Sequence, residues 1–540
     1  MAFERRGFFK TDKLLKSKIF ITVIFLSLFN AFNLSAITFK VASYNVENLF
    51  DLQYDGREYP EYIPYTGFKW DNSTYYKKLE NIAKVLCDLD AHIIGLQEIE
   101  SEMALKDLIA TIKNRNCKYY KYYTIVKDKK EIPVRTALIS VFPIVKKREI
   151  KLSGDFRDIL QAKIDIGGKK LTIFVNHWKS KRWPEKHRIV FAERLIKEIG
   201  KLKTYDDYII LGDFNSNYNE FKAIKYNYKQ NNTKGLTGIN HILTTVSNNQ
   251  LIDKFTILKN KGIRYHYNLW LEIDKFERFS YIFRNRRETP DGIIISQGLF
   301  DNLNISYVDC SFEVFKPPYL FNNNKINRWQ RAKSGKAWHI GKGYSDHLPI
   351  YASFTNEPFK IKDDYPSTLF KKISNLYDDY KGKAIIKNVA IIYQHKNNCI
   401  IKSLNDRAIY CYNCLDSPKL FNVYDLLIHR IKKYKGLTEI TSANIINIKG
   451  KIRDTEKFYI ECNENTNYIN NINEICSELE GIYKDEYLYF GKQKIRLFMP
   501  KNIKIENNKK ISLQKVRIGF LKEPAIFVDE FSQLKNEYKH

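Results

Sequence analysis

Short apolar runs of strand length recur along the first two thirds of the chain, and several of them stop at polar residues. The run 208–211 is followed by Gly212, Asp213, Phe214 and Asn215. On an extended backbone, residues two positions apart face the same way, so Asp213 and Asn215 would leave a buried strand side by side. Such a pair can handle a phosphate, a metal ion or a water. The same residues also suit a tight turn, so this motif alone decides nothing.

The apolar runs alternate with helix-like patterns between residues 37 and 356. Strands are predicted over 37–44 and 91–96, with apolar residues at helical spacing around 79–86 between them. A strand-rich stretch follows over 119–175, and its Gly167-Gly168 pair predicts a hairpin. Several strands with few helices predict an α/β fold that has two layers of sheet and helices outside.

The chain changes character after residue 356. A polar stretch to residue 380 predicts a linker with a helix. Five short strands separated by polar turns follow within 384–445, which fits a small Greek-key barrel of the oligonucleotide-binding (OB) kind. The segment 481–531 has a similar rhythm and predicts a second, divergent copy.

The first 36 residues have the pattern of a secretory signal peptide. Basic residues up to Lys18 precede an uncharged apolar run over 19–32, and Leu34-Ser35-Ala36 supplies small residues for cleavage. The mature protein would then start at Ile37, be secreted or periplasmic, and keep no stable membrane association. Retention as an anchor is the alternative, although the run is short for a full membrane span.

The net charge is strongly positive. The 540 residues include 90 Lys and Arg against 61 Asp and Glu, which gives +29. Such a field attracts polyanions, either nucleic acid or an anionic membrane surface. The alternative is a compositional bias toward Lys, spread over solvated faces. With 44% hydrophobic residues the composition is globular, and the length predicts two or three domains.

The eight cysteines do not form the dense framework of a small disulfide-rich domain. Cys411 and Cys414 make a single CxxC motif without a second pair, which is a weak indication of zinc. A local disulfide and buried free thiols are the other interpretations.

Polar clusters end five of the apolar runs. In a packed α/β protein such side chains converge on one rim, where sites tend to lie. Each cluster also has an ordinary interpretation as turn residues, a surface histidine or a helix cap. Together they contain the groups needed to hydrolyse a phosphoester with a divalent ion. The clusters are Asn45, Glu98, Asn176-His177, Asp213 with Asn215, and Asp346-His347.

Chemistry suggests roles for these side chains. Mg²⁺ takes carboxylate oxygens and keeps positions for water and phosphate, which suits Glu98. Water that attacks phosphorus is activated by a His beside a carboxylate, and Asp213 or Asp346 could orient that base or the water. Asn45 and Asn215 are neutral donors that could stabilise charge on the phosphoryl oxygens.

The order of the motifs resembles that of the endonuclease/exonuclease/phosphatase superfamily, which has the DNase I-like fold. The resemblance implies a four-layered α/β sandwich over about residues 37–354. The first motif is similar to that of secreted bacterial nucleases. The motifs that carry the resemblance are 43–51, 95–98, 176–180, 212–215 and 345–349.

The resemblance implies residue roles. Asn45 and Glu98 would handle the metal, which would be Mg²⁺, with Mn²⁺ or Ca²⁺ as alternatives. His177, Asp213 and Asn215 would act at the scissile phosphate.

Further roles are implied at the late motifs. Asp346 would pair with a histidine, and His347 would act at the phosphate or the attacking water. Arg157 and Asp291 match positions that bind the phosphate or substrate. Gly292 departs from the His or Arg that many members carry there, and glycine has no side chain to supply that contact.

The C-terminal segment from 382 to 445 resembles the nucleic-acid-binding barrel that accompanies such nucleases. Tyr residues interleaved with Lys could stack bases along a basic groove. The alternatives are that these rings belong to the core, and that the barrel is only a spacer or a protein-docking unit.

The resulting hypothesis is a secreted, metal-dependent nuclease that hydrolyses phosphodiester bonds of DNA, with RNA as a further candidate. The alternatives are a phospholipase C-, sphingomyelinase- or inositol-phosphate-type phosphoesterase of the same fold, and a non-catalytic binding module. Nucleic acid is the expected partner, and a monomer is favoured. The predicted divisions are signal peptide 1–36, catalytic domain 37–356, linker 357–382, OB-like domain 383–450 and a second OB-like domain over 451–540.

Overall fold

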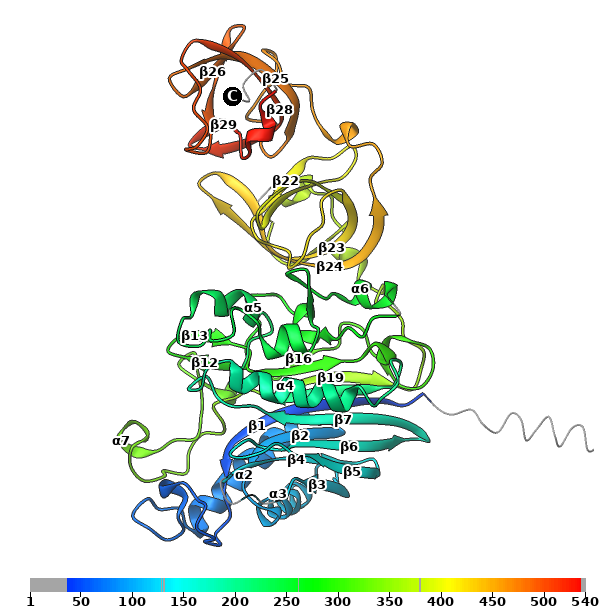
Figure 1. The fold of residues 1–540 in the computed structure, drawn as a ribbon, viewed down its shortest axis with the longest axis vertical. Helices are drawn as coiled ribbons and strands as arrows, with labels where there is room; N and C mark the ends of the chain where they lie inside the picture. Colours follow the sequence, from blue (N-terminus) through cyan, green and yellow to red (C-terminus); the bar gives the residue numbers. More distant parts are fainter. Residues whose placement is uncertain (1–35, 128, 130–131, 261, 378–379, 536–540) are drawn as a thin grey trace, which may run out of the picture.

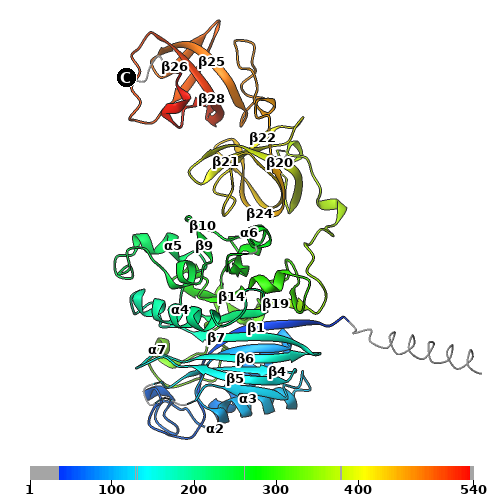
Figure 2. The same cartoon turned by 45° about the vertical axis from the view of Figure 1, so that its right-hand side comes forward.

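The computed structural model describes residues 36–127, 129, 132–260, 262–377 and 380–535. Three bodies follow one another along its longest axis, a sandwich of two sheets and then two closed barrels (Figure 1, Figure 2). Apart from Ala36, the predicted signal peptide lies outside the described residues. Within the described ranges, no helix has both the length and the apolar character needed to cross a membrane.

The first sheet of the sandwich is built around two parallel strands. Their carboxyl ends lie at the same edge because the strands run in the same direction. These strands are β1 (Thr38–Leu49) and β2 (Ile93–Ile99). The rest of the sheet is β19 (Ile350–Thr355), β15 (Ser306–Tyr307) and β16 (Glu313–Val314) on the β1 side, and β4 (Arg135–Ser140) and β3 (Tyr122–Ile125) on the β2 side.

The second sheet has a parallel pair at its centre as well. β7 (Lys169–His177) runs parallel to β8 (Tyr208–Asp213), and β14 (Asp291–Ile295) is antiparallel to β8. The hairpin predicted at Gly167-Gly168 is confirmed, because β6 (Ile159–Ile166) pairs with β7 around that turn. The outer strands are β5 (Ile144–Ile150) and β11 (Tyr267–Asn268).

Helices cover the outer faces of the two stacked sheets, as the pattern predicted. Leu79 of α2 (Asn72–Leu89) and Leu105 of α3 (Glu102–Asn114) share a core with the first sheet. Phe191 of α4 (Lys186–Ile199) packs in a core with the second sheet. A third core, which includes Val41 of β1 and Ile209 of β8, lies between the sheets. The fold of this part is therefore mixed α/β.

Capping side chains fix where α2 and α3 start. Asp71 accepts a hydrogen bond from the backbone N–H of Thr74, and Ser101 accepts one from Ala104. Short elements complete the sandwich: α5 (Glu220–Ala223), α6 (Lys254–Lys259), α7 (Ala332–Gly335), and the hairpins β9 (Val246–Ser247) with β10 (Gln250–Leu251), β12 (Tyr281–Phe283) with β13 (Arg286–Glu288), and β17 (Phe321–Asn322) with β18 (Lys325–Ile326).

The first barrel closes in the order β20-β21-β22-β24-β23, and its third and fifth strands are parallel. The five strands predicted within 384–445 are thereby confirmed. They are β20 (Ala384–His395), β21 (Asn398–Lys402), β22 (Ala408–Cys411), β23 (Asn422–Tyr434) and β24 (Leu437–Lys451).

The helix predicted before this barrel is wrong. The described part of segment 357–377 has two 3-10 turns, Ser367–Leu369 and Ser374–Leu376, and no α-helix. Ile373 and Leu376 are instead fully buried in the core of the first barrel. Tertiary packing of two apolar side chains has therefore overridden the local pattern.

The second barrel repeats the order of the first, β25-β26-β27-β29-β28, again with parallel third and fifth strands. The predicted second copy of the strand pattern is present, but its first strand begins before the predicted segment. The strands are β25 (Ile475–Lys484), β26 (Tyr487–Phe490), β27 (Gln493–Phe498), β28 (Lys509–Leu521) and β29 (Glu523–Phe527).

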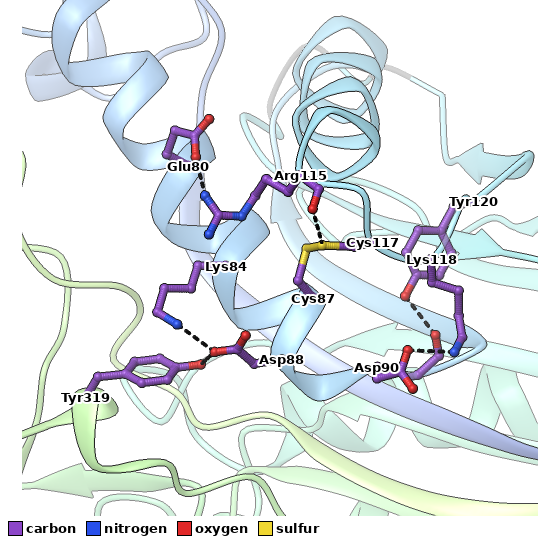
Figure 3. The surroundings of a disulfide bond; sticks show 11 residues. Glu80, Lys84, Cys87, Asp88, Asp90, Arg115, Cys117, Lys118, Tyr120 and Tyr319 are labelled. Carbon is purple, nitrogen blue, oxygen red and sulfur yellow. Dashed lines mark hydrogen bonds and ion pairs between the residues drawn. A yellow bond between two sulfur atoms is a disulfide. The ribbon is translucent and has the colours of Figure 1, made fainter.

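Three disulfides join cysteines of the described chain. Cys87 of α2 is bonded to Cys117, which follows α3, so the two helices of the first sheet are tied together (Figure 3). Cys411–Cys414 is the local disulfide that was one of the interpretations of the CxxC motif, so these thiols are not available to zinc. The third bridge, Cys462–Cys476, lies in the second barrel.

Candidate functional site

The predicted site residues meet at the edge where both sheets present strand ends. In the second sheet His177, Asp213 and Asp291 are register neighbours on three adjacent strands. In the first sheet Asn45 lies on β1, and Glu98 lies near the end of β2. Asn45 Nδ2 is 3.2 Å from Asp213 Oδ2, so the two sheets contribute to one cluster.

Gly212 allows the two central strands of the second sheet to approach at this edge. Its φ is +132°, and a Cβ at this position would lie 2.0 Å from the backbone oxygen of Asn176. Any side chain would therefore separate His177 from Asp213, the next pair in the register. Phe214 then packs fully buried against Trp178, and the chain turns back toward the site at Asn215.

Asn45 holds two carboxylates together. Its amide donates to Glu98 Oε1 at 3.0 Å and to Asp213 Oδ2 at 3.2 Å, while its Oδ1 accepts from the backbone N–H of Glu47. The other oxygen of Glu98 accepts from the N–H of Asn48 at 2.9 Å. Asn45, predicted to handle a metal, thus orients the carboxylates beside it.

Four non-glycine residues of the site have left-handed backbones. The φ angles are 53° at Glu47, 60° at Asn48, 66° at Glu98 and 49° at Asn215. Such conformations cost about 1–3 kcal/mol each and persist where surrounding contacts fix them. Hydrogen bonds to neighbouring site residues supply this fixation at each position. The rim is therefore preorganised.

His177 lies between two of the carboxylates. Its Nε2 is 3.7 Å from Glu98 Oε1 and 3.7 Å from Asp213 Oδ2. Burial, together with the positive charges of Arg157 and His347, lowers the pKa of His177 well below its ordinary value. Its imidazole is therefore neutral at neutral pH and available to accept a proton.

His347 has the opposite protonation state. Its Nδ1 is 2.7 Å from Asp291 Oδ2, which also accepts from Ser280 Oγ at 2.6 Å. Burial lowers the pKa of His347, but Asp291, Asp346 and Asp213 raise it well above its ordinary value. The direct carboxylate partner is Asp291, and Asp346, predicted to pair with a histidine, lies 3.9 Å from Nε2 of His347. Asp291, predicted as a substrate contact, is thus placed behind His347.

The two remaining predicted residues lie at the rim. Asn215 donates its backbone N–H to Asp213 Oδ1 at 2.8 Å and its side-chain amide to the backbone oxygen of Trp178. Arg157 hydrogen-bonds Tyr59, and its charge acts on both Glu98 and His177. The Nε of Arg157 is buried without a hydrogen-bond partner within the described residues.

The carboxylates repel one another in this buried place. Burial raises the pKa of Asp213 to about 7; His347 opposes this shift, and Asp291 and Glu98 add to it. Burial and the charge of Asp346 raise the pKa of Glu98. Asp213, Asp291 and His347 also place one ligand atom each within 4.8 Å of one another, but protonated His347 has no lone pair for a metal, so the carboxylates are the candidate ligands. Crowded carboxylate oxygens of this kind fit a hard divalent cation.

One ionic contact at the site had no sequence signal. Arg328 hydrogen-bonds Glu47 and lies 3.4 Å from Asp346 Oδ2. Glu47, which is buried, also accepts from the backbone N–H of Trp329 at 3.0 Å. Arg328 and Glu47 are 281 residues apart, in segments that no local pattern connects.

The sequence was compared with models of protein families and with curated proteins. The model of the Endonuclease/Exonuclease/phosphatase family matches residues 40–249. No curated protein matches the chain.

Several solved structures are similar to the chain at low scores. Humanized D. rerio TDP2 is 12% identical with a TM-score of 0.37, over 59% of this chain and 98% of that one. An endonuclease/exonuclease/phosphatase family protein from Bacteroides thetaiotaomicron is 16% identical with a TM-score of 0.35, over 60% and 99%. D. rerio TDP2 complexed with single strand DNA product is 14% identical, also at 0.35, over 59% and 98%.

These scores carry no conclusion about activity, so the assignment depends on the sequence match. The matched segment contains four of the five motifs, and the last motif, 345–349, joins them at the same rim through His347 and Asp291. Residues 40–249 match the model of the Endonuclease/Exonuclease/phosphatase family, and the last motif lies at the same rim as the four motifs within that segment.

Proposed function

We propose that this chain is a metal-dependent phosphodiesterase whose substrate is nucleic acid, DNA first and RNA as a further candidate. One observation carries the proposal. A neutral histidine, His177, and a protonated one, His347, face the same cluster of carboxylates at a buried rim. Hydrolysis of a phosphoester needs a proton acceptor for water and positive charge for the phosphoryl oxygens, and this rim offers both.

The acceptor is the pair formed by Asp213 and His177. With its pKa raised to about 7 by burial, Asp213 can take a proton from water at neutral pH. The oxygen of that water forms the new bond to phosphorus. The bond from phosphorus to the leaving oxygen breaks, and that oxygen keeps the electron pair and takes a proton from solvent. Neutral His177, whose Nε2 lies 3.7 Å from Asp213 Oδ2, is the second proton acceptor of this pair.

Positive charge and donors face the phosphoryl group from the other sides. Asp291 occupies Nδ1 of His347, so the Nε2–H of the imidazolium is the atom that can donate to a phosphoryl oxygen. Arg157 supplies a second cation and Asn215 a neutral amide. Donors fixed in advance toward developing charge are usually the largest contribution to such catalysis.

Glu98, with Asn45 and Asp346 beside it, would hold the divalent ion. Mg²⁺ is the proposed ion, and Mn²⁺ and Ca²⁺ are alternatives. When bound, it would polarise a phosphoryl oxygen and neutralise part of its charge.

The two barrels support a nucleic-acid substrate. Around each barrel the five strands follow one another in the order 1-2-3-5-4 of the sequence, and strands 3 and 5 are parallel. We assign both as OB-like, and such small barrels bind oligonucleotides on one face. The proposed divisions remain a catalytic domain over 37–356, a linker over 357–382 and OB-like domains over 383–450 and 451–540.

Export through residues 1–36 and action outside the cytoplasm as a monomer belong to the same proposal. Two bridges between separate segments, Cys87–Cys117 and Cys462–Cys476, support an oxidising compartment.

A substrate panel tests the proposal. The protein is incubated with supercoiled plasmid, single-stranded RNA, sphingomyelin vesicles and an inositol phosphate, each with Mg²⁺. We expect nicked plasmid and little hydrolysis of the lipid or the inositol phosphate. Intact plasmid beside hydrolysed sphingomyelin would replace the nuclease with the phospholipase alternative, and no hydrolysis of any phosphoester would favour a binding module.

A further inference from the structure

A large groove lies where the sandwich and the two barrels meet. Its volume is about 1320 Å³, and all three bodies line it. The sandwich contributes Tyr218 and the segment around Phe276, the first barrel contributes strands β22, β23 and β24, and the second contributes Phe520 and Phe527. None of the residues that form the catalytic rim lines it.

The surplus charge of the groove is positive. Among the described residues that line it, seven are Lys or Arg and two are Asp or Glu. Both carboxylates already face a cation: Asp416 is bonded to Arg278, and Glu439 lies beside Lys432. The two arginines are paired with carboxylates outside the groove. Of the described lining residues, the cations that the groove offers a ligand are Lys222, Lys275, Lys381 and Lys435, and Lys432 is shared with Glu439.

Aromatic rings are exposed between these lysines. The exposed fractions are 54% for Tyr412, 48% for Tyr434 and 44% for Phe276. The ammonium groups of Lys432 and Lys435 lie 5.1 and 5.4 Å from the centre of the Tyr434 ring. A planar group stacked on Tyr434 would therefore place an attached anion close to two positive charges.

The tip that carries Tyr434 is held in place. Gly436, in the turn between β23 and β24, has a φ of +89°, and a Cβ there would lie 2.3 Å from the ring of Phe520. The tip thus touches the second barrel. Asp416 of the first barrel, which also lines the groove, is bonded at 2.8 Å to the buried Arg278 of the sandwich. Both contacts keep the three bodies in one arrangement around the groove.

The groove starts close to the catalytic rim. Tyr218 lines it and follows Asn215 by three residues, which span at most about 11 Å of chain. Phe276 lines it too and precedes Ser280, the residue that bonds Asp291, by four residues. The groove therefore comes within a few residues of the site along two separate segments.

We propose that this groove binds a single-stranded nucleic acid beyond the scissile bond. Repeated phosphates match lysines contributed by three separate segments, and exposed rings match bases that are not stacked in a duplex. An acidic peptide lacks the regular flat groups that such rings stack, and a lipid headgroup would occupy only one end. The inference deepens the proposed function, because it names the substrate class and the path by which it reaches the rim.

The experiment uses a matched pair of double variants of the full chain. Tyr434→Ala with Lys435→Ala removes a stacked ring and a charge from the groove. Tyr489→Ala with Lys494→Ala is the control, since this exposed pair also has its ammonium over a ring, 5.9 Å from the centre, but does not line the groove. Both variants lose the same charge.

Binding is measured in chelator by the fluorescence anisotropy of a labelled oligothymidine. We expect the dissociation constant to rise about tenfold in the groove variant and less than about twofold in the control. The slope of log K against log salt should fall by about 0.7 in the groove variant, the value for one phosphate contact on a single strand. Equal weakening in both variants, or none in either, would overturn the proposal.

Two further arms separate this proposal from its competitors. If the groove variant loses binding to phosphatidylserine vesicles or polyglutamate while the parent never binds the oligonucleotide, the groove serves another ligand and the proposal is wrong. Hydrolysis of bis(p-nitrophenyl) phosphate, which is too small to reach the groove, should be unchanged in both variants. Because binding is measured without catalysis, a parent that hydrolyses no phosphodiester would refute the proposed function and leave the groove test intact.

Discussion

Replacing Asp291 with Asn should change the protonation of His347 while its side chain keeps its position. The carboxylate is 1% exposed, and its Oδ2 lies 2.7 Å from His347 Nδ1. Asparagine has the same shape and still offers an oxygen to Ser280 and His347. What the variant loses is the negative charge, whose attraction for the imidazolium is about 4 kcal/mol at 4 Å in an environment of intermediate dielectric constant.

The sign of the pH effect follows from the causes of the pKa. In the parent, Asp291 raises the pKa of His347 above its ordinary value, so the imidazolium persists through neutral pH. Without that charge, burial is the largest remaining influence and lowers the pKa. The activity that requires protonated His347 should therefore be lost at lower pH than in the parent. At neutral pH we expect kcat to fall by about 10²–10⁴-fold, the usual contribution of such a group.

The assay is the pH dependence of plasmid nicking and of bis(p-nitrophenyl) phosphate hydrolysis, with a thermal melt of each protein. Asp309→Asn is the matched control. Asp309 is also buried and ion-paired, at 2.6 Å from Lys254 Nζ, but lies outside the rim. The control should lose stability and keep the parent's pH profile. An Asp291→Asn protein with the parent's rate and pH profile would refute the assigned role of the His347–Asp291 pair.

Three other changes have definite expected results. Arg157→Gln should lower kcat/KM by about 10–100-fold, since a charged hydrogen bond contributes about 1.5–3 kcal/mol. Arg157→Lys should recover part of the activity. Equal rates for the parent and the Gln variant would mean that Arg157 does not act at the site. The double variant Cys87→Ser with Cys117→Ser removes a disulfide between cysteines 30 residues apart. In a denaturant titration its free energy of unfolding should be lower by about 3–4 kcal/mol. An unchanged midpoint would contradict this. Arg278→Met removes the cation that is bonded to Asp416, so proteolysis between the sandwich and the first barrel should become faster. Hydrolysis of bis(p-nitrophenyl) phosphate should stay constant. An unchanged cleavage pattern would mean that this ion pair does not hold the barrel.

The strand ends at the rim could be predicted because each depends on a local pattern. An apolar run followed by Asp213 and Asn215 signals a strand end, and parallel neighbours place such ends on one edge. The pairing of His347 with Asp291 depends instead on β14 lying antiparallel beside β8, a contact between segments far apart in sequence. The contact of Arg328 with Glu47 is hidden for the same reason.

The errors outside the site have equally specific causes. The start of β25 was not predicted because the exposed residues Glu478 and Glu480 interrupt its apolar positions, so no continuous apolar run marks this part of the strand. The helix expected before residue 380 is replaced by turns because Ile373 and Leu376 insert into the first barrel. In both places the secondary structure depends on packing within a barrel, which the local composition does not reveal.

The central claim is that the rim around His177 hydrolyses phosphodiester bonds with the help of a divalent ion. The most direct measurement is the nicking rate of supercoiled plasmid by the parent, by His177→Ala and by His92→Ala, each with Mg²⁺ and with chelator. His92 is a suitable control, since it lies half-buried just before β2, at the end of that strand opposite to Glu98.

We expect nicking by the parent and by His92→Ala in Mg²⁺, none in chelator, and none by His177→Ala with an unchanged thermal melt. Full activity of a folded His177→Ala protein, or nicking that persists in chelator, would contradict the central claim.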